Sequence, residues 1–266
     1  MTTIGRGPGG TLPSGHAARS APPLRPTEVE VPRSRASDRR SYTVRYTMPE
    51  PTDRQVQERM GQSYALDRLW GETMGLTSGD TKEKPLREVI AVLEATGTAY
   101  AVIGGIAMQI HSPEPRTTLD IDLAVRSFAE VPSDALAKAG FVHEGRYAHS
   151  DNWRAPGNGP RGERVPVQFS AEDVGIHEAI ARARVVDAGG FRLRVAAPFD
   201  LLVLKLAAAE EPRRRPTKRL QDMTDIVLLS KEFPEVAAAF PDLQERVNRL
   251  AAKLLTVGRD RDGPER

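Results

Sequence analysis

Two aspartates, Asp120 and Asp122, stand two residues apart in the stretch LDIDLAV, residues 119–125. Alternate residues of a β-strand face the same side, so this spacing places both carboxylates on one face. A hard divalent cation such as Mg²⁺ binds one or two protein carboxylates and keeps its other positions for water and phosphate oxygens. The pair therefore predicts a site for Mg²⁺, or Mn²⁺, on Asp120 and Asp122.

A glycine pair, Gly104-Gly105, precedes the aspartates and follows the short apolar run Tyr100–Ile103. The pattern predicts a strand over 100–103, a turn at the glycines and a helix over 106–111. Glycine lets a backbone approach a polyphosphate closely, and the N-terminus of a helix presents N–H groups to an anion. We therefore expect Gly104 and Gly105 to contact the phosphates of a nucleotide.

The glycine pair followed by Arg116, Thr118, Asp120 and Asp122 resembles the nucleotidyltransferase superfamily, and more narrowly the minimal nucleotidyltransferases of the AbiEii and MenT toxin type. The resemblance covers residues 85–230. It implies Mg²⁺-dependent transfer of a nucleoside monophosphate from an NTP to a hydroxyl, with Arg116 and Thr118 among the nucleotide-binding residues. It further implies a tRNA end or a protein side chain as acceptor, and a separate antitoxin protein as partner.

The same resemblance implies a catalytic lysine and a later acidic residue, here Lys205 in LLVLKLAAAE and Asp222 or Asp225 in KRLQDMTDIVLL. A lysine in an apolar helix is costly to bury without a paired anion or a phosphate. We expect Lys205 to neutralise a phosphate oxygen; the alternative is an ammonium that extends to water. For Asp222 and Asp225 a site role and a surface ion pair with Lys218 or Arg219 both stay open, and the resemblance favours Asp222 for the site.

One position departs from the superfamily pattern. The strand VPVQF carries Gln168 where these proteins usually place a third carboxylate, which takes the proton of the attacking hydroxyl. A neutral amide cannot accept that proton. Two hypotheses follow: another carboxylate such as Asp222 or Glu172 replaces it, or the domain is a catalytically weak or inactive nucleotide-binding regulatory module.

Other polar and aromatic residues leave alternatives open. His111 ends the helix after the glycine pair, and it either lies near a nucleotide base or is a core or capping histidine. Trp153, in a predicted loop, is a candidate for stacking on a base. The basic cluster Arg213–Arg215 with Lys218 and Arg219 either binds an RNA backbone or a triphosphate, or is a solvated loop.

The elements that must position these residues alternate between strands and helices, which indicates an α+β fold: a nucleotidyltransferase-like mixed β-sheet flanked by helices, with a helical C-terminal segment. Apolar periodicity and turn residues predict strands over 100–103, 119–125, 141–147, 165–169 and 191–195, a loop over 151–163, and helices over 86–97, 106–111, 133–139, 176–184, 199–209, 220–229 and 241–255.

Composition divides the chain into four parts. Residues 1–50 hold seven Pro, five Gly and eight Arg, so we expect a disordered tail there. Residues 51–82 are interpreted as a linker with a possible docking helix, and residues 83–232 as the nucleotidyltransferase-like domain. A C-terminal helix and a frayed tail are expected over 233–266.

The chain has 266 residues, a formal net charge of +2 and no cysteine. Without cysteine, disulfide scaffolds, thiolate metal sites and cysteine nucleophiles are excluded. No run of about 18 apolar residues is present, so we expect no membrane span. The N-terminus lacks the apolar stretch of a secretory signal, which favours a cytoplasmic location.

Overall fold

A computed structural model describes residues 27–32, 41–46, 51–74, 81–115, 117–157, 164–171 and 173–256, and the chain divides into two compact units, Met1–Thr47 and Met48–Arg266. In the first unit, β1 (Thr27–Pro32) pairs antiparallel with β2 (Ser41–Tyr46). We expected no element there. The sequences TEVEVP and SYTVRY alternate β-branched or aromatic residues with polar ones, a strand pattern that the overall composition obscures. The rest of residues 1–50 lies outside the described residues.

The second unit is built on a sheet of seven described strands in the order β5-β6-β7-β4-β3-β9-β8. The central strand β4 runs parallel to β7 and antiparallel to β3, and β3 runs parallel to β9. The predicted mixed sheet and α+β class are therefore confirmed. The strands are β3 (Tyr100–Val102), β4 (Ile121–Val125), β5 (Val142–Arg146), β6 (Asp151–Arg154), β7 (Pro166–Ser170), β8 (Arg184–Asp187) and β9 (Arg192–Val195).

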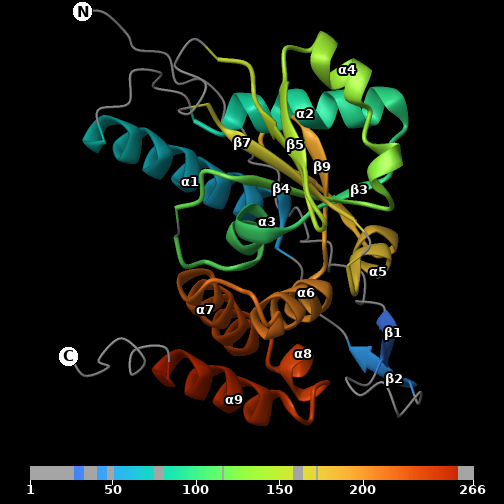
Figure 1. Ribbon diagram of the computed structural model, residues 1–266, viewed down its shortest axis with the longest axis vertical. Helices are drawn as coiled ribbons and strands as arrows, with labels where there is room; N and C mark the ends of the chain where they lie inside the picture. Colours follow the sequence, from blue (N-terminus) through green and yellow to red (C-terminus); the bar gives the residue numbers. More distant parts are fainter. Residues whose placement is uncertain are drawn as a thin grey trace, which may run out of the picture. The chain divides into compact units, whose positions relative to one another are not determined.

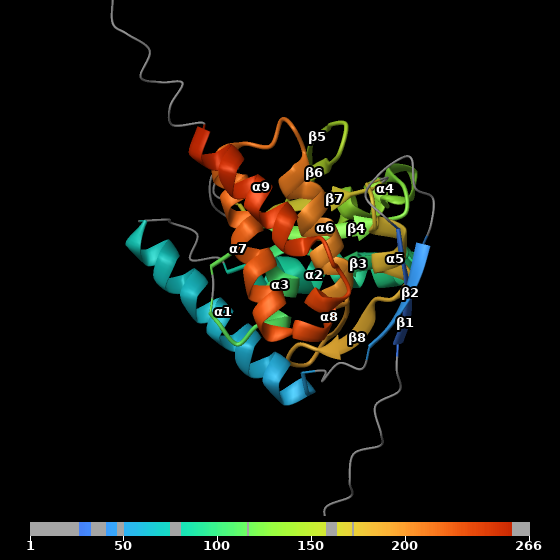
Figure 2. The same cartoon turned by 90° about the horizontal axis from the view of Figure 1, so that it is seen from below.

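Helices cover both faces of this sheet. In Figure 1, α2 and α4 lie on one side, and α3, α6 and α7 lie on the other; Figure 2 shows α6, α7, α8 and α9 together in front of the sheet. None of the described helices is long and apolar enough to cross a membrane. The helices are α1 (Asp53–Thr73), α2 (Glu83–Thr96), α3 (Gly104–His111), α4 (Ser133–Lys138), α5 (Ile176–Ala181), α6 (Pro198–Glu210), α7 (Pro216–Glu232), α8 (Pro234–Ala238) and α9 (Leu243–Thr256), with a 3₁₀ turn η1 (Phe128–Glu130).

Local sequence explains where several helices begin and end. Thr52 caps α1 in a capping box with Gln55, which satisfies two backbone N–H groups. Gly97 ends α2 with φ of +68°. Proline opens both α6 and α7 in the first turn, where its missing N–H is not needed.

A buried ion pair joins α1 to the start of α2. The Lys82 ammonium lies 2.7 and 2.8 Å from the two carboxylate oxygens of Asp67, and both side chains are fully buried. Val56 and Met60 of α1 are buried as well. Residues 51–82 therefore include a long helix that packs on α3 and β8.

Two predicted elements differ from the structure, and one helix was not predicted. The predicted loop over 151–163 begins with strand β6, whose Asp151 and Trp153 are buried, so the period-2 pattern of this short strand was missed. The predicted helix 176–184 ends at Ala181 and is followed by strand β8. The predicted helix 241–255 corresponds to α9, and the short helix α8, which begins at Pro234, was not predicted.

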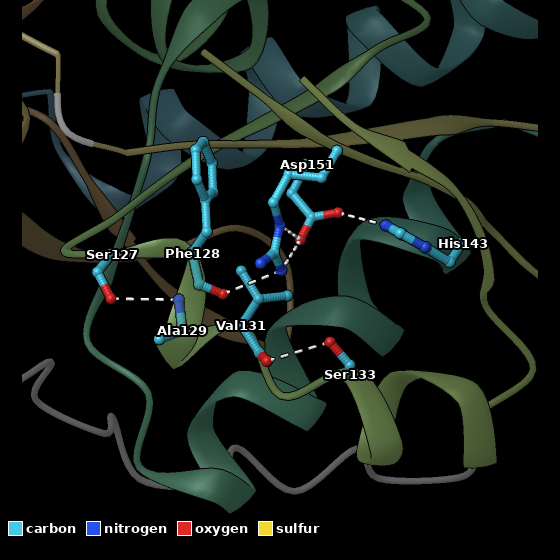
Figure 3. Close-up of polar contacts among 8 residues, drawn as sticks. Ser127, Phe128, Ala129, Val131, Ser133, His143 and Asp151 are labelled. Carbon is cyan, nitrogen blue, oxygen red and sulfur yellow. Dashed lines mark hydrogen bonds and ion pairs between the residues drawn. The ribbon is translucent and has the colours of Figure 1, made fainter. Parts of the chain in front are cut away.

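A buried carboxylate fixes the hairpin formed by β5 and β6. Asp151 accepts hydrogen bonds from Arg146 (Nη2 to Oδ2, 2.6 Å), and its Oδ1 lies 2.7 Å from His143 Nε2. Arg146 also donates to the backbone oxygen of Phe128 in η1. Figure 3 shows His143 and the loop 127–133 arranged around Asp151. These contacts hold the two ends of the hairpin turn at fixed positions.

Candidate active site

The turn from β3 into α3 presses against β4. Gly104 has φ of +61°, and a Cβ built on it would lie 2.0 Å from Oδ2 and 2.8 Å from Cβ of Asp122. A Cβ on Gly105 would lie 2.6 Å from Thr118 Oγ1. The N–H of Gly105 donates to the Asp122 carboxylate. The glycine pair is thus required by close packing, and it directs the N-terminus of α3 at Asp122.

Asp120 directly precedes β4 and Asp122 is the second residue of that strand, and both are partly exposed. Burial, and then the negative charge of Asp120, raise the pKa of Asp122 above its ordinary value. A cation at this position would relieve that repulsion. The described residues contain no group of three or more His, Asp or Glu able to hold a metal. Two carboxylates nevertheless suit Mg²⁺, which takes its other ligands from water and phosphate.

These carboxylates open into a cleft with two lobes. The apolar lobe, of about 400 Å³, is lined by Ile103, Leu201 and Leu204 among others. The polar lobe, of about 640 Å³, is lined by Asp120, Thr118 and the basic residues of the α6–α7 turn. Volumes of this size hold small-molecule ligands. Both lobes share Asp122, His149, Gln168, Lys205, Glu211, Arg214 and Asp222.

Lys205 lies on α6, where it faces an acidic pair on α7. Its Nζ is 2.7 Å from Asp225 Oδ2 and 3.2 Å from Asp222 Oδ1. Arg214 donates from Nε to the other oxygen of Asp222, at 2.9 Å. Both carboxylates are almost fully buried, and 15% of the Lys205 side chain is exposed. The ammonium is therefore held at the cleft wall by two carboxylates.

The alternative of surface ion pairs for Asp222 and Asp225 is wrong. Arg219 is buried and donates to the backbone oxygen of Ala209 at 2.9 Å. Lys218 lies 3.5 Å from Gln221 Oε1. The predicted partners, Lys218 and Arg219, lie on the same helix as the two aspartates, whereas the partners in the structure come from α6 and from the turn after it.

Gln168 stands directly beside the metal-site candidates. It pairs with Asp122 in the register of the parallel strands β4 and β7, so both side chains lie on the same sheet face. It also lines both lobes of the cleft. The neutral amide thus occupies the position next to Asp122 where the resemblance implies a third carboxylate.

The structure places the remaining predicted residues as follows. Thr118 lines the polar lobe, whereas Arg116 and Glu172 lie outside the described residues. His111 is buried with its Nε2 2.9 Å from the backbone oxygen of Ala196, so it is a core histidine. Trp153 is 3% exposed on β6, which makes the stacking interpretation wrong.

Sequence reasoning missed two residues of the cleft, His149 and Asp173. His149 lies in the turn between β5 and β6, and Asp173 lies in the loop before α5. Their side chains are 3.0 Å apart, although 24 positions separate them in the chain. No local spacing marks such a pair, because two separate loops bring it together.

Three comparisons show which known proteins the chain is similar to. A family described as "Nucleotidyl transferase of unknown function (DUF2204)" matches residues 82–253. Among curated proteins, none matches the sequence. Among solved structures, the chain is similar to an antigenic nucleotidyltransferase-like protein from Paracoccidioides brasiliensis, with 21% identity, a TM-score of 0.41, and coverage of 64% of this chain and 91% of that one.

Two further solved structures are similar at lower identity. A putative nucleotidyltransferase from H. pylori has 12% identity and a TM-score of 0.37, covering 67% of this chain and 93% of its own. The lincosamide antibiotic adenylyltransferase LnuA, bound to lincomycin, has 14% identity and a TM-score of 0.38, covering 57% and 99%. The narrower resemblance to the AbiEii and MenT toxins stays a prediction. The family match spans more than half of the sequence, and the chain belongs to this family of nucleotidyl transferases.

Proposed function

We propose that this protein transfers a nucleoside monophosphate from an NTP to a hydroxyl of RNA, with Mg²⁺ or Mn²⁺ bound by Asp120 and Asp122. The observation that carries the proposal is the close approach of Gly104 to the Asp122 carboxylate, which also accepts the N–H of Gly105, beside a lobe lined with basic residues. Phosphate groups and a divalent cation need these two features side by side.

Different residues of the chain would position the phosphates of the NTP and stabilise the leaving pyrophosphate. Gly104 lines the apolar lobe and Thr118 lines the polar lobe, where the phosphates of a nucleotide would lie. Lys205 keeps a positive charge at the cleft wall, where negative charge develops on the leaving pyrophosphate. The divalent cation, when bound, neutralises phosphate charge and orients the oxygens.

The exposed basic residues beside the cleft favour an RNA acceptor. Arg213 and Arg215 line the polar lobe and are exposed, and Lys218 lies next to them. Cations at the mouth of a site attract a phosphate backbone, and their contribution falls as salt rises. A tRNA end is the RNA that the motif resemblance implies, with a protein side chain as the other acceptor and an antitoxin as the partner that would restrain activity.

The test is a transfer assay with each of the four α-labelled NTPs, total tRNA or cell extract, and Mg²⁺. Asp120→Asn/Asp122→Asn removes both charges and nearly preserves side-chain volume. Losing several kcal/mol of charge stabilisation corresponds to a fall in transfer of about 10²–10³-fold. Asp134→Asn is the matched control, because Asp134 is an exposed carboxylate on α4 that lines neither lobe.

Label that moves onto RNA with the wild type and Asp134→Asn, but not with the double variant, supports the proposal. Equal transfer by all three proteins contradicts it. Omitting the divalent cation, or replacing Mg²⁺ by Mn²⁺, tests the cofactor separately. Label on protein rather than RNA would assign the other acceptor.

A second candidate function is a regulatory module that binds NTP without transferring it. Gln168 beside Asp122 favours this reading, because an amide cannot take the proton of an attacking hydroxyl. Such a module would bind one NTP per chain and release no pyrophosphate. Gln168→Asp would then create transfer activity where the wild type has none.

A further inference from the structure

His149 and Asp173 form a hydrogen-bonded pair in the lining of the cleft. His149 Nδ1 lies 3.0 Å from Asp173 Oδ1. The His149 side chain is 73% exposed and lines both lobes, together with Asp122 and Gln168. Of the four histidines in the described part of the chain, it is the one that reaches this cleft. His149 and Asp173 have no role in the proposed binding of the NTP and the divalent cation.

The hydrogen bond decides which nitrogen of His149 is basic. A carboxylate only accepts hydrogen bonds, so the nitrogen that faces Asp173 carries the proton. Nε2 is then left with its lone pair, which accepts a hydrogen bond or a proton. A carboxylate that orients an imidazole and supports its charged form is the arrangement used for general bases.

The hairpin that carries His149 is held from both ends. Arg146 and His143 bind the buried Asp151 at the base of the turn, and Arg146 also reaches the backbone of Phe128 (Figure 3). The N–H of Tyr147 donates to the backbone oxygen of Ser150 at 2.7 Å, which closes the turn around residue 149. The turn is therefore a defined position from which an imidazole can act.

The other candidates for a base are already engaged or neutral. Gln168 is an amide. Both oxygens of Asp222 accept bonds from cations, from Lys205 at 3.2 Å and Arg214 at 2.9 Å, and the carboxylate is buried. Asp122 accepts the N–H of Gly105 and faces Asp120 at the proposed cation site. Glu211 also lines both lobes, and one of its carboxylate oxygens accepts the backbone N–H of Arg213 at 3.1 Å. Among the described residues shared by both lobes, His149 is the one whose basic nitrogen is oriented by a carboxylate.

We propose that His149, oriented by Asp173, is the general base of the transfer reaction. The proton of the acceptor hydroxyl moves to Nε2 as the hydroxyl oxygen bonds to the α-phosphorus of the NTP. The bond from that phosphorus to the oxygen bridging to the β-phosphorus breaks, and pyrophosphate leaves with the electron pair. The imidazolium then returns its proton to water. This assignment rests on the proposed function.

His149→Ala tests the assignment, with His177→Ala as matched control because His177 is an exposed histidine on α5 that lines neither lobe. The assay measures transfer from α-labelled NTP to total tRNA, with NTP affinity measured by equilibrium dialysis. Removing a general base lowers kcat by about 10²–10⁴-fold. We expect the NTP Kd to stay within about twofold, and added imidazole to restore part of the kcat.

The pH profile gives a readout that a merely structural residue would not change. Wild-type transfer should be lost in acid, because a protonated imidazole cannot accept the proton of the hydroxyl, and His149→Ala should not show that loss. The charged groups that line the two lobes with His149 are common to both proteins, so their effect cancels in the comparison. These groups are Asp120, Asp122, Asp173, Lys205, Glu211, Arg213, Arg214, Arg215, Lys218 and Asp222. Asp173→Asn should give a smaller loss of kcat than His149→Ala, because Asp173 is a positioning residue.

The outcomes separate this assignment from the proposed function. If wild type and His177→Ala transfer label and His149→Ala transfers it equally well, the assignment of His149 is overturned and the transferase function stands. A loss in His149→Ala that imidazole does not restore and that follows weaker NTP binding also overturns it. If the wild type moves no label onto any acceptor, the proposed function fails and the base assignment fails with it.

Discussion

Gly104→Ala provides the sharpest test of how the β3–α3 turn builds the site. The added methyl carbon would lie 2.0 Å from Oδ2, 2.7 Å from Cγ and 2.8 Å from Cβ of Asp122. Rotating the Asp122 side chain moves its oxygens and leaves Cβ in place, so rotation alone cannot relieve the overlap. Either β4 or the start of α3 must shift, and the carboxylate moves away from the N-terminus of α3.

Gly97→Ala is the matched control for backbone conformation. Gly97 has φ of +68° against +61° for Gly104, and a Cβ on Gly97 would have nothing within 4 Å. An alanine in this left-handed region costs about 1–2 kcal/mol at either position. Overpacking adds about 1–3 kcal/mol at Gly104 alone. We expect Gly97→Ala to lower the free energy of unfolding by about 1–2 kcal/mol and Gly104→Ala by about 2–5 kcal/mol.

Urea denaturation measures both free energies, and NTP binding in the presence of Mg²⁺ measures the site. Gly97→Ala should bind NTP as the wild type does. Gly104→Ala should bind at least about tenfold more weakly, which corresponds to about 1.4 kcal/mol of lost interaction with the displaced carboxylate. Equal unfolding midpoints for the two variants, together with wild-type binding by Gly104→Ala, would refute the close approach of Gly104 to Asp122.

Two further predictions concern buried ionisable groups. Burial lowers the pKa of His111 from 6.5 to about 4, so between these pH values the unfolded chain binds more protons than the folded chain. The contribution of His111 to the free energy of unfolding is therefore fully present above pH 6.5, and it falls by about 3 kcal/mol as the pH falls to 4. Urea midpoints measured from pH 7 to 4 should fall less steeply in His111→Gln than in the wild type, and parallel profiles would show that His111 is not buried. Lys82→Met leaves the Asp67 carboxylate buried without its ammonium, so it should lower the free energy of unfolding by about 3–5 kcal/mol. The double variant Lys82→Met/Asp67→Leu removes both charges and should recover most of that free energy. Equal losses of stability in the two variants would contradict a buried ion pair.

The parts of the fold that sequence predicted are those with a strong local signal. The apolar stripe of α2 ends at Gly97 and predicts a helix, and the alternating residues of β4 predict a strand. Each of these patterns is contained within about ten consecutive residues. Strand β6 was missed because its four residues lie at the start of a stretch rich in Gly and Pro. Strand β8 follows α5 after two residues and has only four residues of its own, so its two valines gave too short a signal, and its antiparallel pairing with β9 completes the strand.

In the candidate site, too, the residues predicted from the sequence are those that lie close together along the chain. Asp120, Asp122 and the glycine pair were predicted from spacing, because one strand and one turn carry them. Lys205 was predicted to meet a phosphate, and the structure adds that it already bridges Asp222 and Asp225 from the neighbouring helix. Such contacts across elements have no fixed sequence separation, so no spacing rule finds them.

The distribution of charge in the cleft is compatible with the proposed transfer even though an amide stands at the third position. Asp222 is neutralised by Lys205 and Arg214, so the acidic face of α7 adds little free negative charge to the cleft. The negative charge that remains at the sheet edge is that of Asp120 and Asp122, where a cation would bind. In the proposed reaction the proton goes to a separate group, His149, whose Nδ1 lies 3.0 Å from Asp173 Oδ1. With the proposed cation site and the proposed base on different residues, each group can keep the charge state that its task requires.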